Sequence, residues 1–210
     1  MRSEDVVALD GRPLGERGAR TRRRLLDATA ELLETHGVRD LRVVDIARDV
    51  GTSPATFYQY FRDVEEAVLT LAEEVGEDLA GVRELLEEPW KGRAGLDAAR
   101  SLVERFVTYW DEHRAVLRTR NLAAQEGDPR FRDVRNRSLR PITEALARKI
   151  AESQRAGKVS TAITPYVAGA ALVASMERLA AFHEALDASR AEVAETVGRI
   201  IYQTVTGRRD

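Results

Sequence analysis

The segment from Val43 to Tyr60 holds the side chains whose type and spacing could contact DNA. Two short helices joined through a single glycine are what a helix-turn-helix requires, and Gly51 permits the positive φ of the tight turn. In such a unit the first residues of the second helix point into the major groove, and its N–H groups face phosphate. We therefore expect DNA contacts from Thr52, Ser53, Pro54, Ala55 and Thr56.

Two tyrosines and a group of arginines flank this segment. Tyr58 and Tyr60 are predicted to lie on the outward side, where their hydroxyls can reach phosphate oxygens. Six arginines and one acidic residue lie between Gly11 and Leu25, so a basic stretch precedes the first helix. Because cations attract the DNA backbone, we expect Arg22 and Arg42 to contact it, with the neighbouring arginines adding charge.

An alternative interpretation requires no DNA. Gly51 could be only a C-cap, and Ser53-Pro54 only an N-cap, between two helices that pack on each other. Each feature taken singly fits that interpretation better. The combination of a small Ala47 at the helix crossing, Gly51, Ser53, the outward tyrosines and the arginines favours DNA binding.

The elements that must position these residues are predicted to be helical throughout. Apolar residues recur at spacings of three and four, and glycine and proline fall between the periodic segments. The sequence therefore predicts an all-α protein of about nine helices. The first is expected to end near His36, with Gly37 as a left-handed C-cap. The main predicted helices cover residues 19–36, 43–49, 54–60, an acidic stretch after Asp63, 96–113, 115–125, 131–156, 165–186 and 191–206.

The composition excludes several classes of protein. Of the 210 residues, 43% are hydrophobic and 32% charged, which fits neither a disordered nor a membrane chain. No run approaches the roughly 20 apolar residues that span a bilayer. The chain has no cysteine, which excludes disulfides, a thiol nucleophile and thiolate metal sites. We expect a cytoplasmic protein.

A wider set of residues, over about positions 20–75, forms a recognisable pattern. It consists of Leu25-Leu26-Asp27-Ala28-Thr29-Ala30-Glu31-Leu32-Leu33, Gly37-Val38, Asp45-Ile46-Ala47, Gly51, Ser53 and Thr56-Phe57-Tyr58-Gln59-Tyr60-Phe61. With this pattern the segment resembles the N-terminal domain of TetR-type transcriptional regulators.

The resemblance implies a domain organisation and a mode of action. Residues 1–16 would form a flexible arm, 17–63 the DNA-binding domain and 64–210 a ligand-binding and dimerisation domain. Members of the family are homodimers, and the usual action is repression of an operator that is relieved by a small-molecule effector. Three positions depart from the family pattern. Arg42 stands where a capping Thr or Ser is usual, Thr52 replaces an aliphatic residue, and Val64 replaces a frequent lysine that holds phosphate.

Candidate effector contacts come from the apolar faces of the later helices, where core packing is the alternative role for each residue. A polar amide such as Asn121 on an apolar face needs a partner, and we expect a mainly hydrophobic effector. The small residues of the 165–186 helix and the aliphatic stripe of the last helix suit packing against a second subunit. The predicted effector contacts are Phe106, Trp110, Leu117, Asn121, Phe131, Leu139, Tyr166, Leu172 and Met176.

An enzyme is a poor match to this sequence. His36, His113 and His183 lie far apart, with no second ligand at metal-binding spacing and no paired nucleophile. The sequence also lacks a glycine-rich phosphate loop. We therefore predict no catalysis, no metal and no cofactor. The alternative to a regulator is a helical adaptor that binds a small molecule and has no operator.

Overall fold

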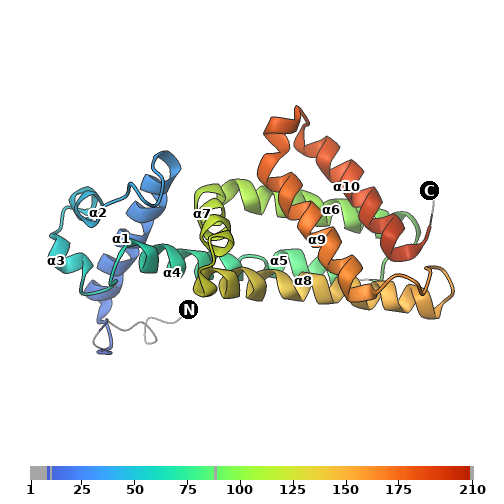
Figure 1. Ribbon diagram of the computed structural model, residues 1–210, viewed down its shortest axis with the longest axis horizontal. Helices are drawn as coiled ribbons and strands as arrows, with labels where there is room; N and C mark the ends of the chain where they lie inside the picture. The colour runs from blue at the N-terminus through green and yellow to red at the C-terminus, as the bar shows by residue number, and fades with distance from the viewer. Residues whose placement is uncertain (1–8, 10, 88, 209–210) are drawn as a thin grey trace. The chain divides into compact units, whose positions relative to one another are not determined.

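The computed structural model describes Leu9, residues 11–87 and residues 89–208. These residues form ten α-helices and one short 3-10 helix, without a β-strand, so the predicted all-α fold is confirmed (Figure 1). The predicted acidic helix after Asp63 is two helices, because Asp78 and Leu79 form a turn that interrupts it. Among the described residues, no helix combines the length and the apolar character that a membrane span requires.

The chain divides into two compact units. Unit 1 comprises the residues up to Val75 together with Ala115–Arg135, and unit 2 comprises Gly76–Arg114 together with the residues from Asn136 onward. The predicted domain boundary at residue 63 stays a prediction. Most of the predicted arm, residues 1–8 and 10, lies outside the described residues.

Unit 1 is built around the first helix. Its core is made by Leu25 and Leu26 from that helix, with Ile46, Phe57 and Phe61, which are all fully buried or nearly so. The unit contains the helices α1 (Glu16–Thr35), α2 (Val43–Val50) and α3 (Pro54–Phe57), most of α4 (Val64–Glu77) and α7 (Arg114–Gln125), and the first turns of α8 (Pro129–Arg155).

The end of α1 differs from the prediction. The helix stops at Thr35, and His36 is extended, with φ −122° and ψ 145°. Gly37 is not among the glycines with positive φ, so the predicted left-handed C-cap there is wrong. The extended backbone at His36 already directs the chain away from the helix, and no left-handed residue is needed.

Unit 2 is organised around the packing of α6 on α10. Its apolar core includes Leu102 and Phe106 of α6, with Ile201 and Val205 of α10. The unit contains α5 (Ala80–Glu87), α6 (Gly92–Glu112), the rest of α8, α9 (Pro165–Phe182), the 3-10 helix η1 (His183–Leu186) and α10 (Arg190–Thr206).

Two glycines let α6 and α10 approach closely. A Cβ on Gly198 would lie 2.8 Å from the Cα of Arg100, and a Cβ on Gly95 would lie 2.5 Å from the carbonyl carbon of Trp90 and 3.0 Å from the ring of Tyr202. The pairing of Gly198 with Arg100 and of Tyr202 with Gly95 shows that the two helices are antiparallel. At Gly198 the obstructing atoms include backbone of α6, so the helices can pack this closely only without a side chain there. At Gly95 the obstruction from α10 is the ring of Tyr202, and the backbone is that of Trp90 just before α6.

We predict that Gly198→Ala lowers the free energy of unfolding by about 1–3 kcal/mol, since the new methyl group forces α10 away from α6. Gly81→Ala is the matched control in the same unit. Its Cβ would meet only the flexible end of Arg105 at 3.3 Å, so stability should stay unchanged or rise by less than about 1 kcal/mol. Urea titrations followed by circular dichroism measure both changes, and equal stability of the two variants would contradict the prediction.

Candidate DNA-binding site

The turn between α2 and α3 is built on Gly51. This residue has φ 71° and ψ 38°, the left-handed conformation that the sequence analysis predicted. Its N–H donates to the carbonyl of Arg48 at 3.0 Å, and the N–H of Thr52 donates to the carbonyl of Ala47 at 2.8 Å. Both bonds use carbonyls at the end of α2 that have no partner within the helix, so the chain folds back at a defined angle.

The third helix begins as predicted and ends early. The hydroxyl of Ser53 accepts a hydrogen bond from the N–H of Thr56 at 3.2 Å, and Pro54 occupies the first turn. The helix ends at Phe57 rather than at Tyr60, since residues 58–60 form a turn. The N–H of Phe61 closes that turn on the carbonyl of Phe57, and both rings are buried, 5.4 Å apart.

A small core holds the two helices together. Ile46, Ala47 and Val50 of α2 are buried with Phe57 of α3, as predicted. These apolar contacts leave the opposite side of α3 outward. Ser53, Pro54 and Ala55 are exposed there, and Thr52 and Thr56 are half-buried at its edges. The residues predicted to read DNA therefore share one accessible surface, which we call the reading surface (Thr52–Thr56).

The two tyrosines are placed differently from each other. Tyr58 is exposed, in agreement with its predicted outward position. Tyr60 is half-buried, and its hydroxyl lies 3.6 Å from the position that a Cβ on Gly18 would take. The hydroxyl of Tyr60 therefore lies beside α1, and its predicted DNA contact stays a prediction.

Three arginines of α1 are engaged within unit 1. Arg22 lies over the ring of Phe61, 5.1 Å from its centre, and 4.0 Å from a carboxylate oxygen of Glu74. Its side chain is 18% exposed, and burial lowers the pKa of the guanidinium below its usual value. Arg23 binds Glu74 at 2.6 Å, and Arg24 donates to the carbonyl of Val50 at 2.7 Å. Arg22 thus packs inside the unit instead of facing outward as expected.

Two other arginines of α1 have the exposure that we expected of Arg22. Arg17 and Arg20 are exposed, and no side-chain interaction of either is found in the part of the chain that the structure describes. The charge count of the sequence included both residues, but it could not separate them from Arg22. Whether an arginine of α1 is packed or exposed depends on which side of the helix faces Phe61 and Glu74.

Arg42 precedes α2 in the position of the N-cap. Its side chain makes no capping hydrogen bond to the backbone, so the departure from the family pattern removes the cap. Instead its guanidinium binds Asp45 at 2.8 Å and 3.3 Å, and Arg48 binds the same carboxylate at 2.8 Å. The hydrogen bond from Arg42 lowers the pKa of Asp45. Both arginines remain largely exposed, as a phosphate contact requires.

The start of α4 is fixed by its own polar residues. The carboxylate of Asp63 accepts from the N–H of Glu66 at 2.8 Å, and Glu66 accepts from the N–H of Arg62 at 2.6 Å. The guanidinium of Arg62 binds Glu66 as well, at 3.1 Å, while staying mostly exposed. Val64 is the first helical residue. Arg62 is therefore the exposed cation nearest in sequence to the position of the missing lysine.

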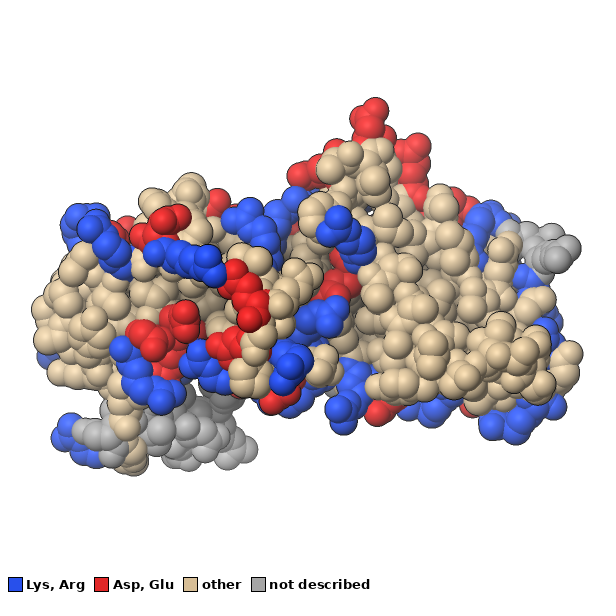
Figure 2. All heavy atoms as spheres, in the orientation of Figure 1, with Lys and Arg blue, Asp and Glu red and all other residues tan. Residues whose placement is uncertain are grey.

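The surface of unit 1 shows these charges beside an uncharged area. Figure 2 shows mostly uncharged side chains where Figure 1 places α3, with basic side chains next to them. The sequence explains the uncharged area, because no charged residue occurs from Val50 to Phe61. Base edges are read by polar and apolar contacts, and phosphates by cations. The arrangement matches that division of roles.

The predicted effector contacts do not gather around a described cavity. Asn121 is half-buried, and its side-chain oxygen accepts from Arg120 at 3.0 Å. Tyr166 is 53% exposed, because it lies in the first turn of α9 on the side away from the core, so its predicted inward position is wrong. Two cavities that the described residues of unit 2 form are lined by other residues. The buried members of the set are Phe106, Trp110, Leu117, Phe131, Leu139, Leu172 and Met176.

We predict that Gly51→Ala destabilises unit 1 by about 1–2 kcal/mol, because an L-residue with a Cβ is strained at this positive φ. A Cβ there would meet no atom within 4 Å, so the effect isolates the backbone conformation. Gly51→Asn should cost less, since asparagine tolerates the left-handed region. Thermal denaturation compares the two variants, and a larger loss for asparagine than for alanine would contradict the turn geometry.

Comparisons with known proteins agree with this geometry. Residues 82–210 match the family model described as "Tetracyclin repressor-like, C-terminal domain", and residues 25–71 match "Bacterial regulatory proteins, tetR family". A Haemophilus influenzae protein described as an uncharacterized HTH-type transcriptional regulator is 26% identical over 189 residues, which cover 88% of this chain and 86% of the relative.

Solved structures share the fold at low sequence identity. The fatty acid degradation regulator FadR from Bacillus halodurans has a TM-score of 0.68 and 15% identity, with 91% of this chain and 97% of that chain covered. The regulator FadR from Bacillus subtilis in complex with stearoyl-CoA has a TM-score of 0.62 and 16% identity, with 89% and 99% covered.

Proposed function

This chain belongs to the TetR family of bacterial regulatory proteins, and we propose that it is a homodimeric repressor that a mainly hydrophobic small molecule releases from a palindromic operator. It is a transcriptional regulator with a helix-turn-helix DNA-binding domain. The observation that carries the proposed operator binding is the exposed reading surface, together with the exposed cations of α1 and of the start and end of α2 in the same unit.

The proposed DNA contacts divide by chemistry. Ser53, Ala55 and Thr56 would meet base edges in the major groove, where hydroxyl and methyl groups find partners. Arg42 would meet phosphate, and we add Arg17 and Arg20, which the structure leaves exposed. Arg22 would act indirectly, because its contacts with Phe61 and Glu74 hold α1 in place within unit 1.

The proposed dimer uses α9. Val167 is 64% exposed, and Tyr166, Phe182 and Leu186 are exposed as well, next to the small exposed residues of the same helix. Val167, Ala171, Ala174 and Phe182 are exposed at the spacing of one helix face, with the guanidinium of Arg178 over the ring of Phe182 at 3.7 Å. An exposed apolar face of this kind marks an interaction site.

Most of the aliphatic stripe of α10 is buried within unit 2 while Ile200 is exposed, so the contribution of α10 to the dimer stays a prediction. The buried members are Val193, Val197, Ile201 and Val205.

The proposed release mechanism runs through α4. This helix begins directly after the turn that follows α3, and its residues continue from unit 1 into unit 2. An effector among the apolar side chains of the helices that follow α4 would move α4 and change the separation of the two reading surfaces in the dimer. Two reading surfaces fit one DNA duplex only when their separation is about 34 Å, which is one turn of the DNA helix, or a multiple of it. The complex of the FadR relative with stearoyl-CoA supports a largely apolar effector.

We predict that the double substitution Arg17→Gln/Arg20→Gln weakens DNA binding about tenfold or more. The DNA used is the region upstream of the gene that encodes this chain. The slope of log K against log salt should fall by about 0.9 for each lost phosphate contact. Fluorescence anisotropy at several salt concentrations measures both quantities. The control is Arg148→Gln/Arg155→Gln, which removes the same charge from exposed positions of α8 in unit 2.

An unchanged salt slope in the α1 double variant would contradict the assigned phosphate contacts. Absence of salt-dependent binding by the unmodified protein would favour the alternative, a helical adaptor without an operator. Both double variants should unfold at the same temperature as the unmodified protein, because the exchanged side chains are exposed.

For the dimer, we predict that Val167→Glu/Phe182→Glu shifts the protein to monomers, because four buried carboxylates per dimer cannot be solvated in an apolar interface. Sedimentation velocity measures the mass in solution. Leu9→Glu is the control, an exposed apolar residue of unit 1 that is changed in the same way. A dimer that survives the α9 double substitution would place the interface elsewhere.

A further inference from the structure

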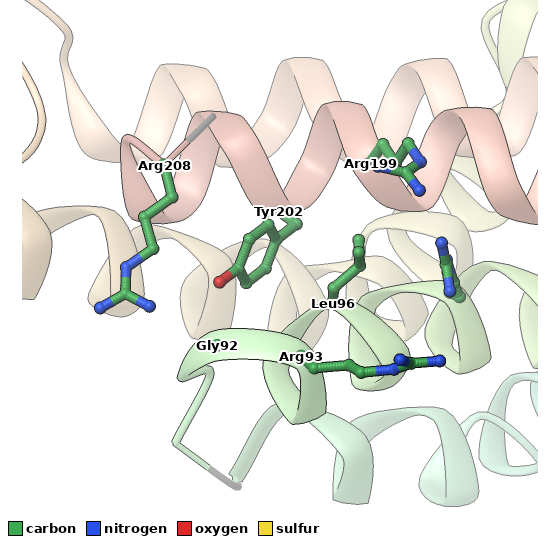
Figure 3. A pocket seen from close by; sticks show the side chains of 7 residues that line it. Gly92, Arg93, Leu96, Arg199, Tyr202 and Arg208 are labelled. Carbon is green, nitrogen blue, oxygen red and sulfur yellow. The ribbon is translucent and has the colours of Figure 1, made fainter. Parts of the chain in front are cut away.

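One groove of unit 2 gathers arginines. It has a volume of about 500 Å³ and lies between the first turns of α6 and the last turns of α10. Figure 3 shows the side chains of both helices around it, with Arg208 beyond the end of α10. Its lining includes four cations and an apolar part, formed by Arg93, Arg100, Arg199 and Arg208 with Leu96 and Tyr202.

Carboxylates fix two of these cations. Arg100 binds Glu195 at 2.7 Å and Asp97 at 3.3 Å, and Arg199 binds the same Glu195. The pairs join α6 to α10 and hold the two guanidinium groups in place. Glu195 and Asp97 are both used by these contacts. The hydrogen bond from Arg199 lowers the pKa of Glu195, so the carboxylate stays ionised at neutral pH.

The other two cations lack a close partner. Arg93 is 90% exposed, and its nearest carboxylate, that of Asp97, lies 4.0 Å away and is already bound to Arg100. Arg208 is exposed, and no ion pair of its side chain is found in the described part of the chain. Among the described residues, four cations around the groove therefore face two carboxylates. The excess positive charge is left for an anion from solution.

The apolar part of the groove comes from the close packing of the helices. Tyr202 is almost fully buried against Gly95, where a Cβ would approach its ring to 3.0 Å. Leu96 is half-buried beside it. The apolar surface that a ligand in the groove meets is therefore mainly that of Leu96 and the methylene groups of the arginines, with the edge of Tyr202. The volume falls within the range of about 300–1,000 Å³ that small-molecule sites occupy.

We propose that this groove binds an organic phosphate, at a site separate from the predicted effector contacts, none of which lines it. The planar guanidinium group matches phosphate oxygens with two parallel hydrogen bonds. Arg93 and Arg208 stand on different elements with Tyr202 and Leu96 between them (Figure 3), so a phosphate bound by either cation leaves its organic part over the apolar part of the groove. Such a ligand stabilises the folded form of unit 2 by mass action.

The test is isothermal titration of the full chain at low salt with ADP, phenyl phosphate, benzoate and inorganic pyrophosphate. We expect saturable binding of ADP or phenyl phosphate with a Kd below about 1 mM. Tighter binding of ADP than of phenyl phosphate would identify the ligand as a nucleotide. The reverse order would identify it as a smaller phosphate ester. The absence of saturable binding for both overturns the proposal. Equal binding of benzoate overturns the choice of phosphate, and equal binding of pyrophosphate overturns the role of the apolar surface.

Arg93→Gln/Arg208→Gln locates the site. The double variant should bind the same phosphate at least about tenfold more weakly, because the groove loses both cations that lack a close carboxylate. Arg148→Gln/Arg155→Gln loses the same charge elsewhere in unit 2 and should bind as the unmodified protein does. Equal weakening in both variants, or no weakening in the first, overturns the assignment. Operator binding is measured separately, and its loss or retention leaves this result unaffected.

Discussion

The left-handed backbone at Gly51 is the constraint on which the reading surface depends. The α3 helix has four residues, which is too few for helix formation to proceed on its own. Its direction is set from outside, by the turn hydrogen bonds to α2 at one end and by the burial of Phe57 and Phe61 at the other. The cap from Ser53 then completes a helix that its neighbours have already oriented. The exposed residues Thr52–Thr56 are therefore a consequence of backbone geometry and apolar packing.

The arginines of α1 show how one charged stretch serves two purposes. The sequence places an acidic segment after the basic one, and the fold brings Glu74 of that segment to Arg22 and Arg23. These two guanidinium groups are used in packing, where the ring of Phe61 replaces water beside Arg22. Arg17, one and a half turns earlier, is left exposed. The number of arginines in this stretch is therefore larger than the number that can contact DNA. The orientation of α1 decides which arginines are buried and which are exposed.

Features that depend on local sequence could be predicted, and features that depend on a distant partner could not. The helix type, the turn at Gly51, the cap at Ser53 and the buried Ile46 follow from spacing and side-chain chemistry. The capping box of Ser189 and Glu192 at the start of α10 is a local feature of the same kind, with the Ser-x-x-Glu spacing as its signal in the sequence. The burial of Arg22, the exposure of Tyr166 and the break at Asp78 and Leu79 depend on which surfaces meet, and apolar periodicity does not reveal that.

The packing of α6 on α10 limits what the rest of unit 2 can do. Gly95 and Gly198 bring the helices so close that most of the aliphatic stripe of α10, apart from Ile200, is buried within the subunit. An apolar stripe in a sequence therefore does not by itself distinguish a subunit interface from a core. Burial in either place removes the stripe from water with a similar gain of free energy per unit of buried apolar area. The large apolar side chains of unit 2 that stay exposed lie mainly on and beside α9, with Ile200 on α10, and these are the candidates for an interface. The same close packing creates the arginine groove, because antiparallel helices held at short distance leave their long terminal side chains around a shared opening.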